Sequence, residues 1–305
     1  MISEKTVVGA GTEYPLNALL TLPNDLSAPV PAVVMVHGSG PSNMDERFRK
    51  LTPFKDLAEG LANRGVASLR YDKRTFAHAR KMAKIDPTVR EETIDDALLA
   101  IGLLKNDSRI DSGRVFLLGH SMGAMLAPRI DAEGGNVRGF VLLAGTPHRL
   151  EEVVLRQLRQ SGGGNFLLKG IVALEYKIFS KKFVGLYEMS DKEAKKKKFA
   201  GNLSLSYFKE MGRKTAADYL LESDKPALIL QGERDFQVLA DDDFRLFQTL
   251  LAERSNTFFK LYEGLDHAFV PALYDSILKA NAEFGTERHI GDDVITDIAF
   301  FVKEH

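Results

Sequence analysis

The chain has 305 residues, of which 44% are hydrophobic and 27% charged, and its formal net charge is −1. This composition is that of a soluble globular protein, because a disordered chain has fewer apolar residues and a larger net charge. The absence of cysteine from the sequence excludes disulfides, cysteine-ligated metals and thiol nucleophiles. The balance of 41 Lys and Arg against 42 Asp and Glu gives no sign of nucleic-acid binding.

The N-terminal residues 1–5 do not resemble a secretory signal, since they lack a basic start followed by an apolar segment. No stretch approaches the roughly 18–20 apolar residues that a membrane-spanning helix needs. We therefore expect a cytoplasmic protein without a membrane span.

Short apolar runs bounded by turn residues recur along the chain. Runs of this kind, without alternating polar residues, are typical of parallel strands buried on both faces. We expect strands at 32–36, 66–71, 115–118, 140–143, 227–230 and 258–262. The segment 5–22 is broken by glycines and by Tyr14-Pro15, which favours an antiparallel edge hairpin.

Helical patterns separate these strands, with apolar residues on one stripe in 54–64, 91–105 and 292–304. Strands alternating with helices predict an α/β protein with a mostly parallel sheet flanked by helices. Residues 150–222 interrupt this order, because they contain no clear strand but helical patterns at 151–160, 166–183 and 216–222. We expect this insertion to form a helical cap on a core made of 1–149 and 223–305.

A possible nucleophile follows the predicted strand 115–118, in the sequence Gly119-His120-Ser121-Met122-Gly123. A serine on a tight turn between a strand and a helix needs small residues two positions before and after it, because side chains there would clash with the backbone. The helix that follows would place its N-terminus beneath the serine and favour negative charge. The pattern therefore predicts Ser121 as a nucleophile.

A serine hydroxyl needs a histidine base oriented by a carboxylate. Of the seven histidines, His267 follows the last predicted strand, where a loop can bring it to Ser121. Asp235 and Glu233 follow the strand before it, and we expect Asp235 to be the acid because apolar residues shelter it. Glu233, next to Arg234, is better explained as a solvated ion pair.

Backbone N–H groups must also bind the oxyanion of an acyl-transfer intermediate. The N–H of Met122, directly after the nucleophile, is one expected donor. The second should come from the glycine-rich loop 37–41, where Ser39 is favoured over Gly38.

Five segments occur in the order found in one family: His-Gly-Ser-Gly-Pro at 37–41, Arg-Tyr-Asp-Lys-Arg at 70–74, Gly-His-Ser-Met-Gly at 119–123, 230–238 and 266–269. Together they resemble the α/β-hydrolase fold, in its bacterial carboxylesterase branch close to dienelactone-hydrolase and prolyl-oligopeptidase-like catalytic domains. The resemblance implies Ser121 as nucleophile, Asp235 as acid, His267 as base, and no cofactor. It predicts a serine carboxylesterase acting on small, including cinnamoyl-type, carboxylic esters.

Several points stay open. A peptidase, thioesterase or acyltransferase could use the same triad, and a non-catalytic ligand-binding protein is a more remote alternative. No metal motif is found, and a monomer and a dimer are equally compatible with the sequence. We expect contacts to a small-molecule ester from four further residues, namely Gly38, His120, Phe166 and Phe236.

Charge is distributed unevenly between the predicted cap and core. Residues 150–222 carry 14 Lys and Arg against nine Asp and Glu, a net charge of +5, which leaves −6 on the rest of the chain. We expect this difference to help dock the cap. The lysine run 195–198 is interpreted as a solvated surface. Charged residues in 70–74 could contact substrate at this edge of the sheet, but ion pairs with the loop at Asp45-Glu46 are favoured.

Overall fold

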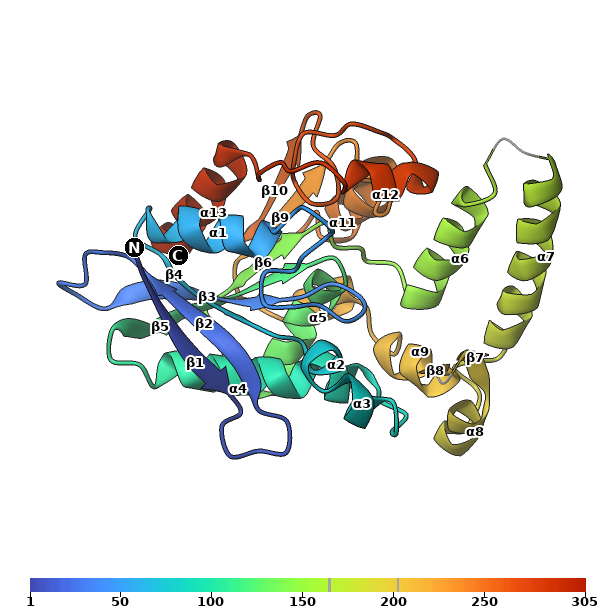
Figure 1. Cartoon of the computed structure of the whole chain (residues 1–305), viewed down its shortest axis with the longest axis horizontal. Coiled ribbons are helices and arrows are strands. Elements are labelled where there is room, and N and C mark those ends of the chain that lie inside the picture. Colours follow the sequence, from blue (N-terminus) through green and yellow to red (C-terminus); the bar gives the residue numbers. More distant parts are fainter. Residues whose placement is uncertain (164–165, 202) are drawn as a thin grey trace.

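Eight strands of the described chain form one sheet in the order β1-β2-β4-β3-β5-β6-β9-β10 (Figure 1). The structure is a computed structural model that describes residues 1–163, 166–201 and 203–305; side chains at 166–168 lie outside this description. β1 and β2 pair antiparallel, as do β2 and β4, and the other pairings are parallel. The strands are β1 (Ile2–Val8), β2 (Leu16–Leu22), β3 (Val30–Val36), β4 (Ala67–Tyr71), β5 (Ile110–His120), β6 (Phe140–Leu143), β9 (Ala227–Gly232) and β10 (Thr257–Tyr262).

The predicted mostly parallel sheet and the antiparallel edge hairpin are both confirmed. Helices cover both faces of the sheet, with α1 and α13 on one face and α4 and α5 on the other (Figure 1). Outside the cap, the helical elements are α1 (Pro53–Ala62), α2 (Arg74–Ala77), α3 (Ala79–Met82), η1 (Arg90–Ile94), α4 (Asp95–Lys105), α5 (Met122–Ile130), η2 (Asp131–Gly135), η3 (Ala240–Phe244), α11 (Arg245–Leu250), η4 (Ile277–Lys279), α12 (Ala280–Glu283) and α13 (Asp292–Glu304).

Side-chain alternation along β3 divides the core into two layers. Val33 and Met35 pack with residues of α1 and α13, whereas Val34 and Val36 pack with residues of α4 and α5. Successive side chains of a strand point to opposite faces, so a run with no polar residue is what a strand covered on both sides requires. This burial fixes the position of the loops that follow the carboxyl ends of the parallel strands.

The predicted cap, 150–222, lies between β6 and β9. Its elements are α6 (Leu150–Gln160), α7 (Phe166–Phe183), α8 (Asp191–Lys196), β7 (Lys198–Ala200), β8 (Leu203–Ser204), α9 (Leu205–Met211) and α10 (Ala216–Leu221). The expectation of no strand in this segment is wrong for β7 and β8, which pair antiparallel. They are too short to show an alternating pattern in the sequence.

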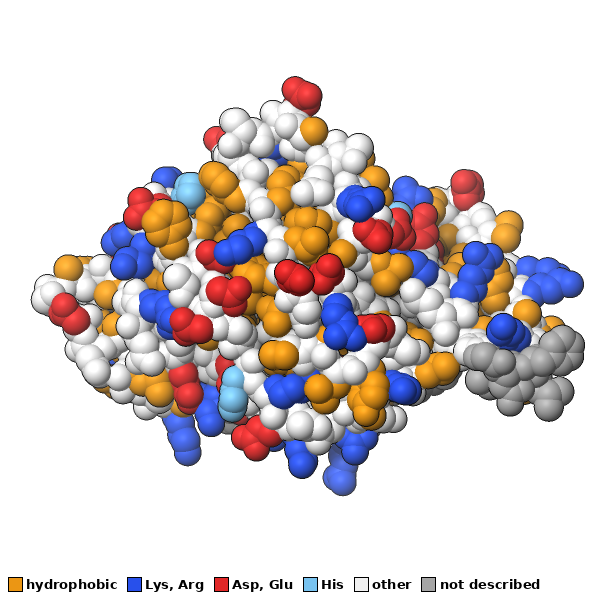
Figure 2. All heavy atoms as spheres, turned by 90° about the horizontal axis from the view of Figure 1, so that it is seen from above, with side chains coloured by type: hydrophobic (Ala, Val, Ile, Leu, Met, Phe, Trp, Pro, Cys, Tyr) orange, Lys and Arg blue, Asp and Glu red, His pale blue; other side chains and the backbone are white. Residues whose placement is uncertain are grey.

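The cap elements differ in how they contact the rest of the molecule. Apolar residues of α9 and α10, such as Phe208 and Leu220, belong to the same buried cluster as residues of β5. α6 and α7 extend away from the sheet instead (Figure 1). In Figure 2, Lys and Arg side chains gather at the outer end of the cap. The division into core and cap at 150 and 222 stays a prediction.

Among the described residues, no helix has the length and apolar character needed to cross a membrane.

Candidate active site

Ser121 lies on the turn between β5 and α5. Its backbone angles, φ 52° and ψ −117°, are rarely adopted by residues other than glycine, and such strain is typical of turns that expose a nucleophilic serine. A Cβ on Gly119 would lie 2.3 Å from the Gly123 carbonyl oxygen, and a Cβ on Gly123 would lie 2.0 Å from the Val36 carbonyl oxygen. Both positions therefore require glycine for this turn to form.

Asp235 and His267 are brought together by the loops that follow β9 and β10. Nδ1 of His267 lies 2.7 Å from Oδ2 of Asp235, and both side chains are buried. Gln231 Nε2 donates to the same carboxylate oxygen at 3.0 Å. The N–H groups of Gln237 and Val238 donate to the other oxygen at 2.8 and 3.0 Å. These bonds hold the carboxylate in the orientation that an imidazole-orienting acid needs.

Glu233, the alternative acid, occupies a different position. Its side chain is exposed and accepts a hydrogen bond from the N–H of Gly264 at 3.1 Å. The carboxylate that His267 contacts is that of Asp235. The geometry thus favours Asp235 over Glu233.

Ser121 and His267 line one cavity of about 230 Å³, together with Gly38, Ser39 and Met122. The candidate triad and the expected oxyanion donors therefore converge on one place. Helix α6 of the cap contributes part of the wall. The remaining lining residues are Phe48, Met125, Thr146, Leu150, Val153, Val154, Gln157, Gln237 and Val238.

The sequence predicts the helix α6 but not that it forms part of the cavity wall. Leu150, Val153, Val154 and Gln157 have the spacing of a single helical face, and this was the available signal. Gln157 Nε2 donates to the backbone oxygen of Gln237 at 3.2 Å, which ties α6 to the loop that carries the acid.

Arg156 makes a second connection between α6 and the core. Its guanidinium lies 2.5 Å from Asp242 and 2.6 Å from Asp243. Together with His148, these two carboxylates form a group with the spacing of metal ligands. We assign no metal there, because Arg156 already pairs with both carboxylates and Asp243 also accepts hydrogen bonds from Thr146 and the N–H of Leu239.

The loop after β3 presents its backbone to the cavity. The N–H of Gly38 donates to Oε1 of Glu46 at 2.6 Å, so it is not available to an oxyanion. Among the described residues, the N–H of Ser39 has no hydrogen-bond acceptor. Met122 is the first residue of α5, where a backbone N–H has no acceptor within the helix. Of the N–H groups of Gly38, Ser39 and Met122, those of Ser39 and Met122 are thus without an acceptor in the described structure.

Glu46 also links this loop to the histidine before the nucleophile. Its Oε2 lies 3.1 Å from Nδ1 of His120, and Nε2 of His120 lies 2.9 Å from the carbonyl oxygen of His267. Burial lowers the pKa of His120, but the Glu46 carboxylate outweighs burial and raises that pKa above its ordinary value. A protonated His120 forms an ion pair with Glu46 through Nδ1 and donates a hydrogen bond from Nε2 to the His267 carbonyl oxygen. The role of Glu46 was missed, because nothing in the sequence predicts that an exposed-looking loop carboxylate is buried.

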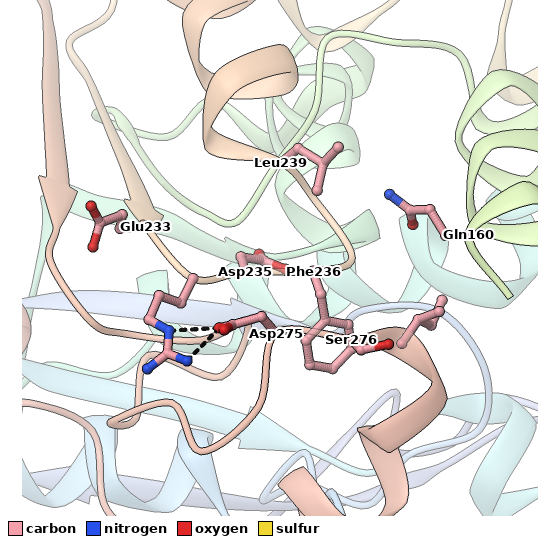
Figure 3. A pocket seen from close by; sticks show the side chains of 9 residues that line it. Gln160, Glu233, Asp235, Phe236, Leu239, Asp275 and Ser276 are labelled. Carbon is pink, nitrogen blue, oxygen red and sulfur yellow. Dashed lines mark hydrogen bonds and ion pairs between the residues drawn. The ribbon is translucent and has the colours of Figure 1, made fainter. Parts of the chain in front are cut away.

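His120, Phe236 and Phe166 were expected to contact substrate. His120 is buried and does not line the cavity that contains Ser121. Phe236 lines a different groove of about 610 Å³, with Gln160, Leu239 and residues 275–277 (Figure 3). That groove contains neither Ser121 nor His267. The side chain of Phe166 lies outside the described residues.

The charged run 70–74 forms buried ion pairs. Arg70 Nε lies 2.9 Å from Asp45, as expected, whereas Arg74 pairs at 2.5 Å with Asp96 in α4. Burial raises the pKa of Asp96 to about 6 despite this arginine. Lys73 is almost completely buried and points toward Gly38.

A sequence model described as the alpha/beta hydrolase family matches residues 33–276. Esterase EstD from Thermotoga maritima is 36% identical over 285 residues, which are 92% of this chain and 63% of that protein. The chain therefore spans less than two thirds of the length of this curated relative.

Solved structures of two esterases share the fold. Est1E from Butyrivibrio proteoclasticus matches with a TM-score of 0.59 and 15% identity, covering 99% of both chains. Esterase Pf2001 from Pyrococcus furiosus matches with a TM-score of 0.58 and 14% identity, covering 99% of this chain and 92% of that one.

Proposed function

The chain belongs to the alpha/beta hydrolase family, and on that premise we propose that it is a serine carboxylesterase of small carboxylic esters. The observation that carries the proposal is the 2.7 Å contact between His267 Nδ1 and Asp235 Oδ2, beside a cavity that Ser121 also lines. The 36% identity to esterase EstD supports an ester as the bond that is cleaved.

In the proposed mechanism, His267 acts first as a base. Because Nδ1 of His267 is held by Asp235, Nε2 is the nitrogen that takes the proton from the Ser121 hydroxyl. Ser121 Oγ then attacks the ester carbonyl carbon, and a tetrahedral intermediate forms. His267 returns the proton to the leaving alcohol, and an acyl-enzyme remains. Water, deprotonated by the same histidine, releases the carboxylic acid.

The N–H groups of Ser39 and Met122 are proposed to bind the negative oxygen of each tetrahedral intermediate. They approach the cavity from two elements, the loop after β3 and the start of α5. Each such donor contributes about 3 kcal/mol to transition-state stabilisation in enzymes of this type.

The cavity supports a small acyl group. Its volume of about 230 Å³ is below the roughly 300–1,000 Å³ of pockets for drug-sized ligands. Its wall is mostly apolar and includes Val153 and Val154 from α6 as well as Val238 and Phe48. A structure of Est1E was solved with ferulic acid bound, so aromatic esters belong in the test.

The test is hydrolysis of p-nitrophenyl acetate, butyrate and octanoate, methyl ferulate, a thioester and a peptide p-nitroanilide. We expect the short-chain esters to react fastest. Ser121→Ala should lower kcat by about 10⁶-fold, since the acyl-enzyme cannot form. Ser27→Ala, which removes an exposed hydroxyl distant from the cavity, is the matched control. Activity of Ser121→Ala within tenfold of native, or cleavage of the thioester or anilide alone, contradicts the proposal.

A further inference from the structure

Lys73 is a buried cation that the proposed mechanism does not use. Its side chain is 2% exposed. The ammonium donates to the carbonyl oxygen of Gly38 at 2.8 Å and lies 2.6 Å from Oε1 of Glu92. A buried charge is costly unless it is paired, and Glu92 supplies the compensating charge. The remaining contact of Lys73, with Gly38, therefore needs an explanation.

The carbonyl of Gly38 and the N–H of Ser39 are two ends of one peptide group. No described peptide bond is cis, and in a trans peptide the C=O and N–H point in opposite directions. Lys73 holds the carbonyl toward the interior. The N–H of Ser39 is consequently directed away from Lys73, and Ser39 is one of the residues that line the cavity.

The peptide before Gly38 is fixed as well. Glu46 Oε1 accepts a hydrogen bond from the Gly38 N–H at 2.6 Å. The Glu46 carboxylate therefore holds the peptide group before Gly38, and the Lys73 ammonium holds the peptide group after it. The loop lies directly against the nucleophile, because a Cβ on Gly38 would lie 3.2 Å from Ser121 Cβ. At this distance, a small rotation of the Gly38–Ser39 peptide would misdirect the donor.

We propose that Lys73 is a positioning residue that orients the Ser39 N–H as an oxyanion donor. The inference rests on the proposed esterase function. The ammonium acts in two ways: it fixes the peptide plane, and it polarises the peptide group so that the N–H becomes a stronger donor.

The cap takes part in this arrangement through Tyr207 of α9. The Tyr207 hydroxyl donates to Oε2 of Glu92 at 2.8 Å, while Lys73 contacts Oε1 of the same carboxylate. The hydroxyl also lies 3.3 Å from the sulfur of Met122, whose N–H is the other proposed donor. Docking of α9 is therefore coupled to the elements that carry both oxyanion donors.

The test compares Lys73→Met and Tyr207→Phe with Arg74→Met. Arg74→Met is the matched control, because it breaks a neighbouring buried ion pair, with Asp96, that does not touch Gly38. For each folded variant, kcat and KM for p-nitrophenyl butyrate are measured. The inhibition constant of butylboronic acid, whose tetrahedral serine adduct imitates the intermediate, is measured in parallel.

Lys73→Met should lower kcat by about 10²-fold, the effect of one lost oxyanion donor, with KM within about threefold of native. The boronic acid should bind more weakly by a similar factor. Tyr207→Phe should shift both quantities in the same direction by a smaller factor, and Lys73→Arg should recover part of the loss. Arg74→Met should lower the melting temperature and leave both quantities near native.

Native-like boronic acid binding by Lys73→Met would overturn the inference, as would equal losses in Arg74→Met. If Lys73→Met does not fold, Tyr207→Phe decides: parallel losses in kcat and boronic acid affinity support the inference, and native values of both overturn it. Absence of esterase activity in the native chain would instead overturn the proposed function, so the two failures are distinguishable.

Discussion

The Glu46 carboxylate lies 3.1 Å from Nδ1 of His120 in the protein interior. Through this pair, the loop at Gly38 is connected to the backbone of His267, whose carbonyl oxygen lies 2.9 Å from Nε2 of His120. The buried ion pair thus connects the loop of the proposed oxyanion donor to the loop of the proposed base.

This pair predicts a pH dependence of stability. Burial lowers the pKa of His120, but the Glu46 carboxylate and the His267 carbonyl raise it above 6.5 overall. The contribution of His120 to the free energy of unfolding is therefore complete below about pH 6.5. It is lost as the pH rises through the pKa of His120 in the folded protein. Burial raises the pKa of Glu46, but His120 and the Gly38 N–H lower it below 4.5 overall. The stability from Glu46 is therefore present above about pH 4.5 and is lost as the pH falls through its folded pKa.

Urea unfolding of native protein and Glu46→Gln between pH 5 and 9 measures this effect. We expect the alkaline decline in the free energy of unfolding to be smaller in Glu46→Gln, since the charge that holds the His120 proton is gone. His289→Gln, which alters an ion pair of an exposed histidine with Asp56, should keep the native profile. Identical profiles for native protein and Glu46→Gln would show that the pair is not charged.

The acid of the triad is tested by two substitutions. Asp235→Asn should lower kcat by about 10⁴-fold, because an amide favours the wrong tautomer of His267. Glu233→Gln removes a neighbouring charge that contacts Gly264 and not His267, and it should change kcat less than threefold. Steady-state kinetics with p-nitrophenyl acetate decides. A larger effect of Glu233→Gln would move the role of the acid to that residue.

The turn at Ser121 predicts unequal effects of two glycine substitutions. Gly123→Ala places a Cβ 2.0 Å from the Val36 carbonyl oxygen, so it should reduce the free energy of unfolding by more than about 4 kcal/mol. Gly102→Ala, in α4 with open space around the added Cβ, should raise it by about 0.5–1 kcal/mol. Denaturant unfolding distinguishes the two, and equal effects would contradict the geometry of the turn.

The unequal charges of cap and core predict a salt effect on α6. Arg156 of the cap pairs with Asp242 and Asp243 of the core. In a further ion pair the charges are reversed, with Arg129 in the core and Glu210 in the cap. Added salt screens such contacts, so amide hydrogen exchange in α6 should accelerate with ionic strength. Arg156→Gln should accelerate exchange already at low salt. Salt-independent exchange in α6 of the native protein would show that apolar packing alone holds this helix.

The sequence was sufficient for the features that depend on local pattern. Apolar runs predicted the parallel strands because both of their faces are covered, and Gly-x-Ser-x-Gly predicted the strained turn because only glycine fits there. The contacts of Lys73 and Glu46 could not be predicted in this way. The Lys73 ammonium binds the carbonyl oxygen of Gly38, which lies 35 residues earlier in the chain. Glu46 is buried although it lies in a loop, where no periodic pattern of apolar residues indicates burial.

The cavity wall also depends on contacts between residues that are distant in the chain. Helix α6 was expected from its periodicity, but which of its faces meets the cavity depends on Gln157 and Arg156, whose partners lie about 80 residues later. Phe236 shows the same limit, since it follows Asp235 in the chain but lines a groove that contains neither Ser121 nor His267.

The proposed mechanism requires that Ser121 is a nucleophile activated by His267. The most direct measurement is reaction of the native chain with a fluorophosphonate, followed by mass spectrometry of its peptides. We predict one phosphonyl group per chain, located on Ser121, absent from Ser121→Ala and strongly slowed in His267→Ala. Modification at another residue, or an unmodified Ser121 in protein that hydrolyses esters, would contradict the proposed mechanism.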